Sequence, residues 1–88
     1  MADTKDKGHG HIIRYTVDDE PESTTEKVLT PVQIMRSAGI DPETNYLEQI
    51  VKGHHDPISY KDKPNEPIEM KENMQFITKP IGPMPVSY

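Results

Sequence analysis

Four histidines are the residues of this chain whose type and spacing could bind a metal ion. His9 and His11 flank a glycine, and His54 and His55 stand directly before Asp56. Imidazole nitrogens and carboxylate oxygens are ordinary ligands of zinc, nickel and copper. A closed site needs further ligands on a rigid element, and neither a cysteine nor a Glu-x-x-His helix supplies them. We interpret both pairs as solvated polar residues and predict no metal site, with a metal-handling protein as the least favoured hypothesis.

Catalytic chemistry has even less support in this sequence. A nucleophile needs a base beside it, and no serine has a histidine at a recognisable motif spacing. The carboxylates of Asp18, Asp19 and Glu20 fall in an expected turn, where water solvates them. The glycines are dispersed, so the sequence contains no glycine-rich phosphate loop. We predict a non-catalytic protein that needs no cofactor.

Size and composition limit the chain to one small domain with flanking segments. It has 88 residues with 9 prolines and a formal net charge of −5. Residues 1–10 hold no large apolar side chain beyond Met1, and we expect a flexible N-terminal tail there. Residues 11–79 hold nearly all the large apolar side chains, so the folded domain is expected in that range. Residues 80–88 are proline-rich and are expected to be an extended C-terminal tail.

Charge and hydropathy argue against several classes of partner. Basic residues are scattered, without a stripe interleaved with aromatic side chains, so nucleic acid is not an expected partner. No apolar run reaches the roughly 18 residues of a membrane-spanning helix, and no apolar stretch follows Met1 as a secretory signal would. Without cysteine the chain has no disulfide and no thiol chemistry. We expect a monomeric, cytoplasmic protein of bacterial type.

One short helix with both ends encoded is expected over residues 31–38. Thr30 is a good N-cap, Pro31 suits the first helical position, and Gln33 completes a capping box. Gly39 suits the left-handed residue that follows a helix. The side chains that share one face at helical spacing, and would pack against a sheet, are Ile34, Met35 and Ala38.

Strand-like runs lie on both sides of this helix. Residues 12–17 are rich in β-forming side chains, and Ile13, Tyr15 and Val17 share one face. The charged residues 18–23, interrupted by a proline, are expected to form a turn, after which residues 25–29 return as the second strand of a hairpin. Further strands are expected at residues 46–51, 58–60 and 74–78. This order predicts an α+β fold of the β-grasp kind, with a mixed four- to five-stranded sheet around one main helix.

The strand expected at residues 46–51 carries apolar side chains on both faces, because neither register of alternation is purely apolar. A sheet covered by one helix leaves its second face to solvent or to a partner protein. Alternatively, the loop at residues 61–67 covers the surplus apolar groups. The candidate partner residues are Tyr46 with Ile50 on one face, Leu47 with Val51 on the other, and Tyr60 on the next strand.

Several short segments occur in an order and spacing that carry a family resemblance. They are residues 29–34 with 38–39, 46–47, 58–62, 67–70 and 74–78. Over residues 12–78 the chain thereby resembles the bacterial multiubiquitin-domain family of ubiquitin-like proteins. The resemblance implies a protein modifier. It also implies protein partners, namely an activating enzyme, a conjugating enzyme, a metal-dependent isopeptidase and target proteins.

The resemblance further implies that a target amine is joined to the carboxyl end of the C-terminal tail. The tail lacks a terminal Gly-Gly pair, since the sequence ends in Val-Ser-Tyr. Trimming after Gly82 would expose a glycine carboxylate, so Ile81, Gly82 and Pro83 are the candidate processing site, although proline after a scissile bond obstructs many peptidases. The alternatives are another processed end or no conjugation at all. In the last case the domain is a non-covalent adaptor that binds a partner through its sheet face.

Overall fold

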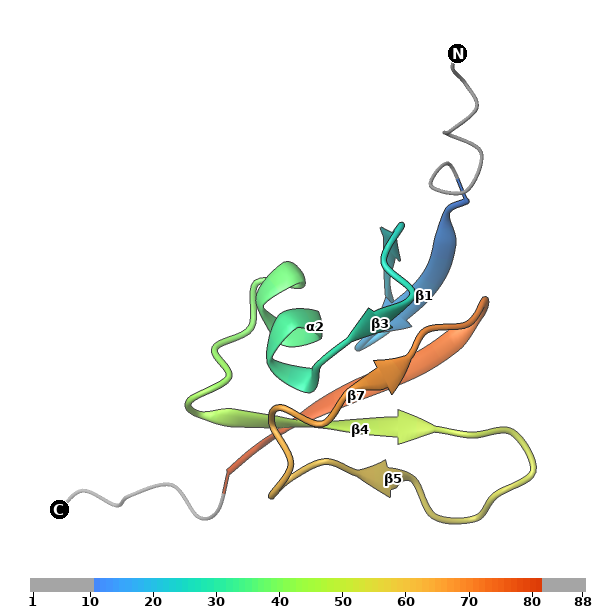
Figure 1. Ribbon diagram of the computed structural model, residues 1–88. Coiled ribbons are helices and arrows are strands. Elements are labelled where there is room, and N and C mark those ends of the chain that lie inside the picture. Colours follow the sequence, from blue (N-terminus) through green and yellow to red (C-terminus); the bar gives the residue numbers. More distant parts are fainter. Residues whose placement is uncertain (1–10, 82–88) are drawn as a thin grey trace, which may run out of the picture.

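Residues 11–81 are the part of the chain that the computed structural model describes. Within this range seven strands and one helix follow one another in an α+β fold (Figure 1). Their bounds are β1 Ile13–Val17, β2 Glu20–Thr24, β3 Val28–Leu29, α2 Pro31–Ser37, β4 Asn45–Ile50, β5 Ile58–Ser59, β6 Ile68–Glu69 and β7 Met74–Pro80.

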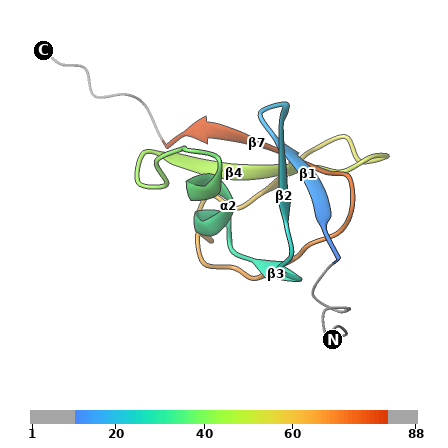
Figure 2. The same cartoon turned by 90° about the horizontal axis from the view of Figure 1, so that it is seen from above.

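Five of these strands form a mixed sheet in the order β2-β1-β7-β4-β5, and β3 pairs with β6 in a separate two-stranded sheet. The central pair β1 and β7 is parallel, whereas β7 is antiparallel to β4 and the two outer pairs are antiparallel as well. Helix α2 and β3 lie on the same side of the large sheet (Figure 2). The expected mixed sheet with one main helix is therefore confirmed for the described residues, with five strands in the large sheet.

The hydrophobic core lies between the large sheet, α2 and the β3–β6 pair. In β1 the alternation predicted from the sequence is confirmed, because Ile13, Tyr15 and Val17 are all buried on one face. The rings of Tyr15 and Phe76 pack edge to face with their centroids 5.9 Å apart, a favoured aromatic geometry that joins β1 to β7. The remaining buried hydrophobic residues are Leu29, Ile34, Met35, Leu47, Ile68 and Met70.

Helix α2 begins and ends close to where its caps predict. The Thr30 hydroxyl accepts a hydrogen bond from the Gln33 N–H at 3.2 Å, and the Gln33 side chain accepts one from the Thr30 N–H at 2.8 Å. Gly39 has the expected positive φ, +79°. Ile34 and Met35 are fully buried and Ala38, the C-cap, packs against the core. The helix α2 of residues 11–81 is too short to cross a membrane.

The first hairpin is tighter than the sequence suggested. Asp18 and Asp19 form a two-residue loop with φ values of 52° and 68°, so β2 begins at once instead of after a longer turn. The expectation of a second strand at residues 25–29 is therefore wrong, and the last two residues of that segment form β3 instead. Pro21 interrupts no ladder because β2 is the edge strand of the sheet.

The backbone of this hairpin loop leads to a stability prediction for Asp19→Gly. Glycine adopts a φ of 68° without steric cost, and its introduction removes one of three adjacent carboxylates. We expect the free energy of unfolding to rise by up to about 1 kcal/mol, measured by urea denaturation. Gly39→Ala, at a φ of +79°, is the control with the opposite sign. A loss of stability in Asp19→Gly would contradict the assigned turn.

Candidate functional site

The face of the large sheet that points away from α2 is the candidate site, and we call it the outer face. Strand alternation defines it, because Leu47 and Phe76 point into the core and their neighbours along each strand point outward. Its central residues are Thr16 on β1, Gln75, Ile77 and Lys79 on β7, and Tyr46, Glu48 and Ile50 on β4.

The candidate pair Tyr46 and Ile50 and the candidate pair Leu47 and Val51 lie in different environments. Tyr46 and Ile50 lie on the outer face, where Tyr46 is half-buried and Ile50 is exposed. Leu47 has no exposed surface and packs in the core, so no partner reaches it in the folded domain. The proposal of Leu47 as a surface residue is thereby corrected: its alternation places it under the helix. Val51 follows the end of β4 and is half-buried.

Tyr60 does not join the outer face. Its N–H donates to the carbonyl of Leu47 at 2.9 Å, which extends the β4–β5 ladder and turns the Tyr60 ring toward the core. The loop that follows, residues 61–67, runs past the start of the helix, where the Val32 N–H donates to the Pro64 carbonyl at 3.1 Å. Lys61, at its first position, reaches back to the outer face and lies 5.6 Å from the centre of the Tyr46 ring.

An ion pair crosses the middle of the outer face. The Lys79 ammonium lies 3.3 Å from Oε1 of Glu48, with Glu48 buried and Lys79 half-exposed. Glu48 sits between its paired neighbours Ile77 and Ser59, which explains its 8% exposure on an otherwise open face. Its Oε1 makes no aligned hydrogen bond within residues 11–81, so Lys79 supplies the main compensation for this charge.

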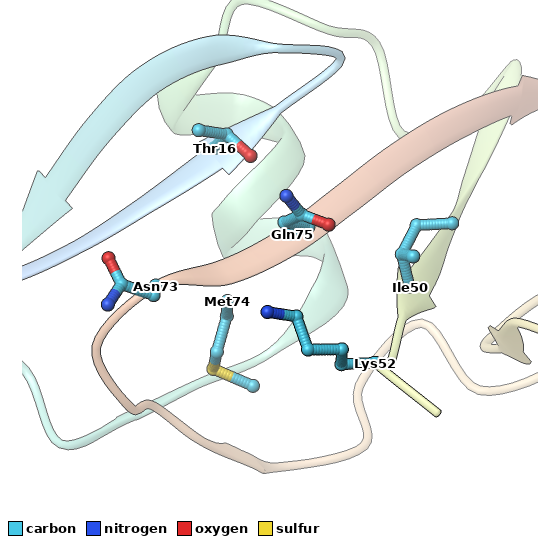
Figure 3. A pocket seen from close by; sticks show the side chains of 6 residues that line it. All are labelled: Thr16, Ile50, Lys52, Asn73, Met74 and Gln75. Atoms are coloured by element: carbon cyan, nitrogen blue, oxygen red, sulfur yellow. The ribbon is translucent and has the colours of Figure 1, made fainter. Parts of the chain in front are cut away.

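A hollow of about 360 Å³ opens at the end of the outer face where β4 ends and β7 begins. Figure 3 shows its side chains, which come from β1, β4, β7 and the segments next to them. They are Thr16, Ile50, Lys52, Asn73, Met74 and Gln75.

Asp18 is a structural residue whose role the sequence did not reveal. Its carboxylate accepts hydrogen bonds from the N–H and the hydroxyl of Thr78, at 2.9 and 2.6 Å, and its own N–H donates to the carbonyl of Phe76. The expectation of a merely solvated turn carboxylate is therefore wrong. These bonds fix the last part of β7 to the first hairpin, although the two residues are 60 positions apart.

A matching contact holds the other end of the parallel strand pair. The Glu72 carboxylate accepts a hydrogen bond from the Arg14 N–H at 3.1 Å, and its second oxygen lies 3.4 Å from the Arg14 guanidinium. The N–H of Asn73 then donates to the carbonyl of Arg14 at 2.8 Å. Side chains therefore extend the short β1–β7 ladder at both ends.

The histidine and tail candidates are not brought into a site within the described residues. His54, His55 and Asp56 are exposed in the turn after β4, and residues 11–81 contain no cluster of three potential metal ligands. His9, Gly82 and Pro83 lie outside the described residues. Ile81, the residue after β7, is exposed, and its N–H donates to the carbonyl of Thr44 at 3.0 Å.

The buried hydroxyl of Tyr15 gives a pH prediction. It has no hydrogen-bond partner within residues 11–81, and burial, assisted by Glu22, raises its pKa above 10. Because the folded state holds the hydroxyl proton of Tyr15 more tightly than the unfolded state does, the free energy of unfolding linked to this proton is constant below pH 10. It falls as the pH rises further. We expect Tyr15→Phe to raise the free energy of unfolding near pH 7 by up to about 1 kcal/mol. The same substitution should weaken the alkaline loss.

Urea denaturation at neutral pH and across the alkaline range checks both parts of this expectation. The alkaline loss should shrink rather than vanish, because burial, assisted by Glu66, also raises the pKa of Tyr60. Tyr60→Phe is the matched variant, and it should remove a second portion of the loss. A Tyr15→Phe protein with an unchanged alkaline profile and lower neutral stability would contradict the burial of an unpartnered hydroxyl.

Comparison of the chain with models of known families, with curated proteins and with solved structures gave no match in any of the three. The functional class is therefore inferred from the fold and the surface. Within residues 11–81 the geometry offers a mixed sheet with one face that the helix leaves uncovered, carrying apolar side chains and cations. It also offers a central last strand whose far end is bonded to the first hairpin.

Proposed function

We propose that this chain is a ubiquitin-like β-grasp protein without catalytic groups of its own. It acts as a protein modifier in a bacterial pathway of ubiquitin-like protein conjugation. The supporting observation is the strand order β2-β1-β7-β4-β5 with one helix on one face and β7 parallel to β1 in the centre. This is the arrangement expected of a β-grasp domain. In it the chain leaves the sheet from the end of its middle strand.

The position of that exit suits enzymes that act on a chain end. Asp18 bonds to Thr78, and the Ile81 N–H bonds to Thr44, so the last described residues have fixed positions against the domain. An enzyme that binds the outer face therefore meets Ile81 at a fixed position on the domain. Gly82 and Pro83, the candidate processing site with Ile81, come next in the sequence.

The chemistry of this proposal needs only a carboxylate from this chain. An activating enzyme joins the carboxylate to the phosphate of AMP from ATP and releases pyrophosphate, and an enzyme thiol then displaces AMP. A lysine amine of the target displaces the thiol and loses a proton, which leaves an amide bond. The proposed partners are an activating enzyme, a conjugating enzyme, an isopeptidase that hydrolyses the amide bond, and the target proteins. We place this pathway in the cytoplasm.

A second candidate function is a non-covalent adaptor. The outer face favours it, since Tyr46, Ile50 and Ile77 lie together on the two neighbouring strands β4 and β7. Apolar and aromatic side chains on an open sheet face are typical of protein interfaces. The adaptor needs this face alone, whereas the modifier needs both the face and the residues after Ile81.

Expression of a tagged full chain in the producing cells separates the two functions. The modifier predicts higher-mass forms that survive boiling in detergent and reductant and that vanish when residues 82–88 are deleted. The adaptor predicts no such forms, but partners that co-purify with the deletion variant and are lost on Ile50→Asp. Ile12→Asp is the control, at an isoleucine before β1 that is 48% exposed against 38% for Ile50, and it should retain whichever of these forms or partners the unmodified chain shows. Higher-mass forms that persist after the deletion would contradict the modifier.

A further inference from the structure

The hollow at the end of the outer face brings together side chains that no local motif connects. Thr16, Gln75 and Ile50 form one row across β1, β7 and β4, because Gln75 is the register partner of both other residues. Lys52 follows the end of β4, and Asn73 precedes β7 with a φ of 67°. In Figure 3 the Lys52 side chain extends from the end of β4 so that its ammonium lies among the other labelled side chains.

The polar groups of the hollow suit a carboxylate. The Lys52 ammonium supplies a positive charge, and the side-chain amides of Asn73 and Gln75 supply N–H donors. No lining residue is acidic, and Lys52 forms no ion pair within residues 11–81. Lys61 adds a positive charge further along the same face, beside Tyr46, whereas the charge of Lys79 is already paired with Glu48. Charge complementarity therefore favours an anionic occupant.

Another hollow, on the first hairpin, lacks this complementarity. It is lined by Arg14, Pro21, Glu22 and Ser23, so it contains a carboxylate of its own. Its cation is already engaged, because the Arg14 guanidinium lies 3.4 Å from a Glu72 oxygen. The hollow at Lys52 is therefore the better anion site.

Two apolar side chains make the hollow suitable for a peptide rather than for a small inorganic anion. Ile50 is 38% exposed, and the half-buried Met74, which packs against the core, also lines the hollow. A volume of about 360 Å³ accommodates one or two side chains and not a folded element. An acidic residue beside an apolar one would fill both the charged and the apolar parts.

We propose that this hollow binds an Asp or Glu side chain, together with a neighbouring apolar side chain, from a peptide segment of a partner protein. The carboxylate pairs with Lys52 and accepts hydrogen bonds from Asn73 or Gln75, and the apolar side chain packs on Ile50 and Met74. The proposal rests on the proposed function insofar as the chain acts through protein partners. It adds the chemistry by which one such partner is recognised.

Selection from a random twelve-residue peptide library displayed on phage, against the purified full chain, tests this site. Enriched peptides should carry an acidic residue next to a large apolar one. Their affinity should fall about fivefold or more in Lys52→Gln, as the loss of one charged contact implies. Lys63→Gln removes an exposed cation from the loop at residues 61–67, away from the hollow, and should keep the wild-type affinity. Circular dichroism checks that both variants fold.

Chemical-shift mapping with the most enriched peptide locates the contact. Shifts centred on Thr16, Ile50, Lys52, Asn73 and Gln75 support the proposal. Shifts elsewhere, enriched peptides without acidic residues, no enrichment at all, or equal binding by Lys52→Gln would each overturn it. Because the selection uses the purified chain without conjugating enzymes, its failure removes the hollow as a site and leaves the modifier function to its own test.

Discussion

Leu47→Asp is expected to unfold the domain. Leu47 has no exposed surface and packs beneath α2 at the centre of the core. A carboxylate at this position must either stay charged in an apolar environment or take up a proton, and the loss of packing adds to that penalty. We expect a cost above about 4 kcal/mol, most of the roughly 5–10 kcal/mol that a domain of this size has in total. Far-UV circular dichroism and urea denaturation measure it.

Ile50→Asp is the matched control, since it places the same charge three residues further along the same strand. Ile50 is exposed on the outer face, beside Lys52. The free energy of unfolding of the Ile50→Asp protein should therefore differ from that of the unmodified chain by less than about 1 kcal/mol. If Leu47→Asp remains folded while Ile50→Asp unfolds, the two faces of β4 have been exchanged. The outer face, and both functional proposals that depend on it, would then be wrong.

Asp18→Ala is expected to lower the free energy of unfolding by about 2–3 kcal/mol. The substitution removes two hydrogen bonds from a carboxylate to Thr78, each stronger than a neutral bond, and places alanine at a φ of 52°. The effect should be concentrated at the end of β7. Amide hydrogen exchange of Thr78 and Lys79 should therefore accelerate more than exchange at Phe76.

Asp18→Asn separates the effect of the positive φ in the turn from the effect of the carboxylate charge on stability. Asparagine tolerates positive φ and keeps one acceptor for the Thr78 N–H, so its cost should be about half that of alanine. A double-mutant cycle with Thr78→Ala should give a coupling energy of about 1 kcal/mol or more. Additive effects of Asp18→Ala and Thr78→Ala would show that the contact contributes nothing beyond the turn itself.

Local signals explain which parts of the fold were predictable. The caps at Thr30, Gln33 and Gly39 lie within one short segment and define the helix almost to the residue. Alternation located β1, β4 and β7 within one or two residues of their starts. A first hairpin was expected, but its second strand was placed too late in the sequence. Pro21 breaks a strand only where a backbone N–H is needed, and the sequence alone does not tell an edge strand from a central one.

The candidate site depended on information that alternation cannot supply. Both faces of the strand at residues 46–51 are partly apolar, so only the placement of the helix decides that Leu47 is buried. Asp18 and Thr78 meet through strand pairing across nearly the whole domain. The hollow at Lys52 likewise requires the register of three strands. None of these contacts has a short-range pattern.

Mass spectrometry of the chain purified from the cells that produce it tests the modifier proposal most directly. The proposal predicts higher-mass forms in which the Nε of a lysine in another protein carries an amide-linked branch ending in Ile81-Gly82 or in another tail residue. It would be contradicted if the chain were recovered only at the mass of its unattached form, with Tyr88 retained and no lysine-linked branch on any protein.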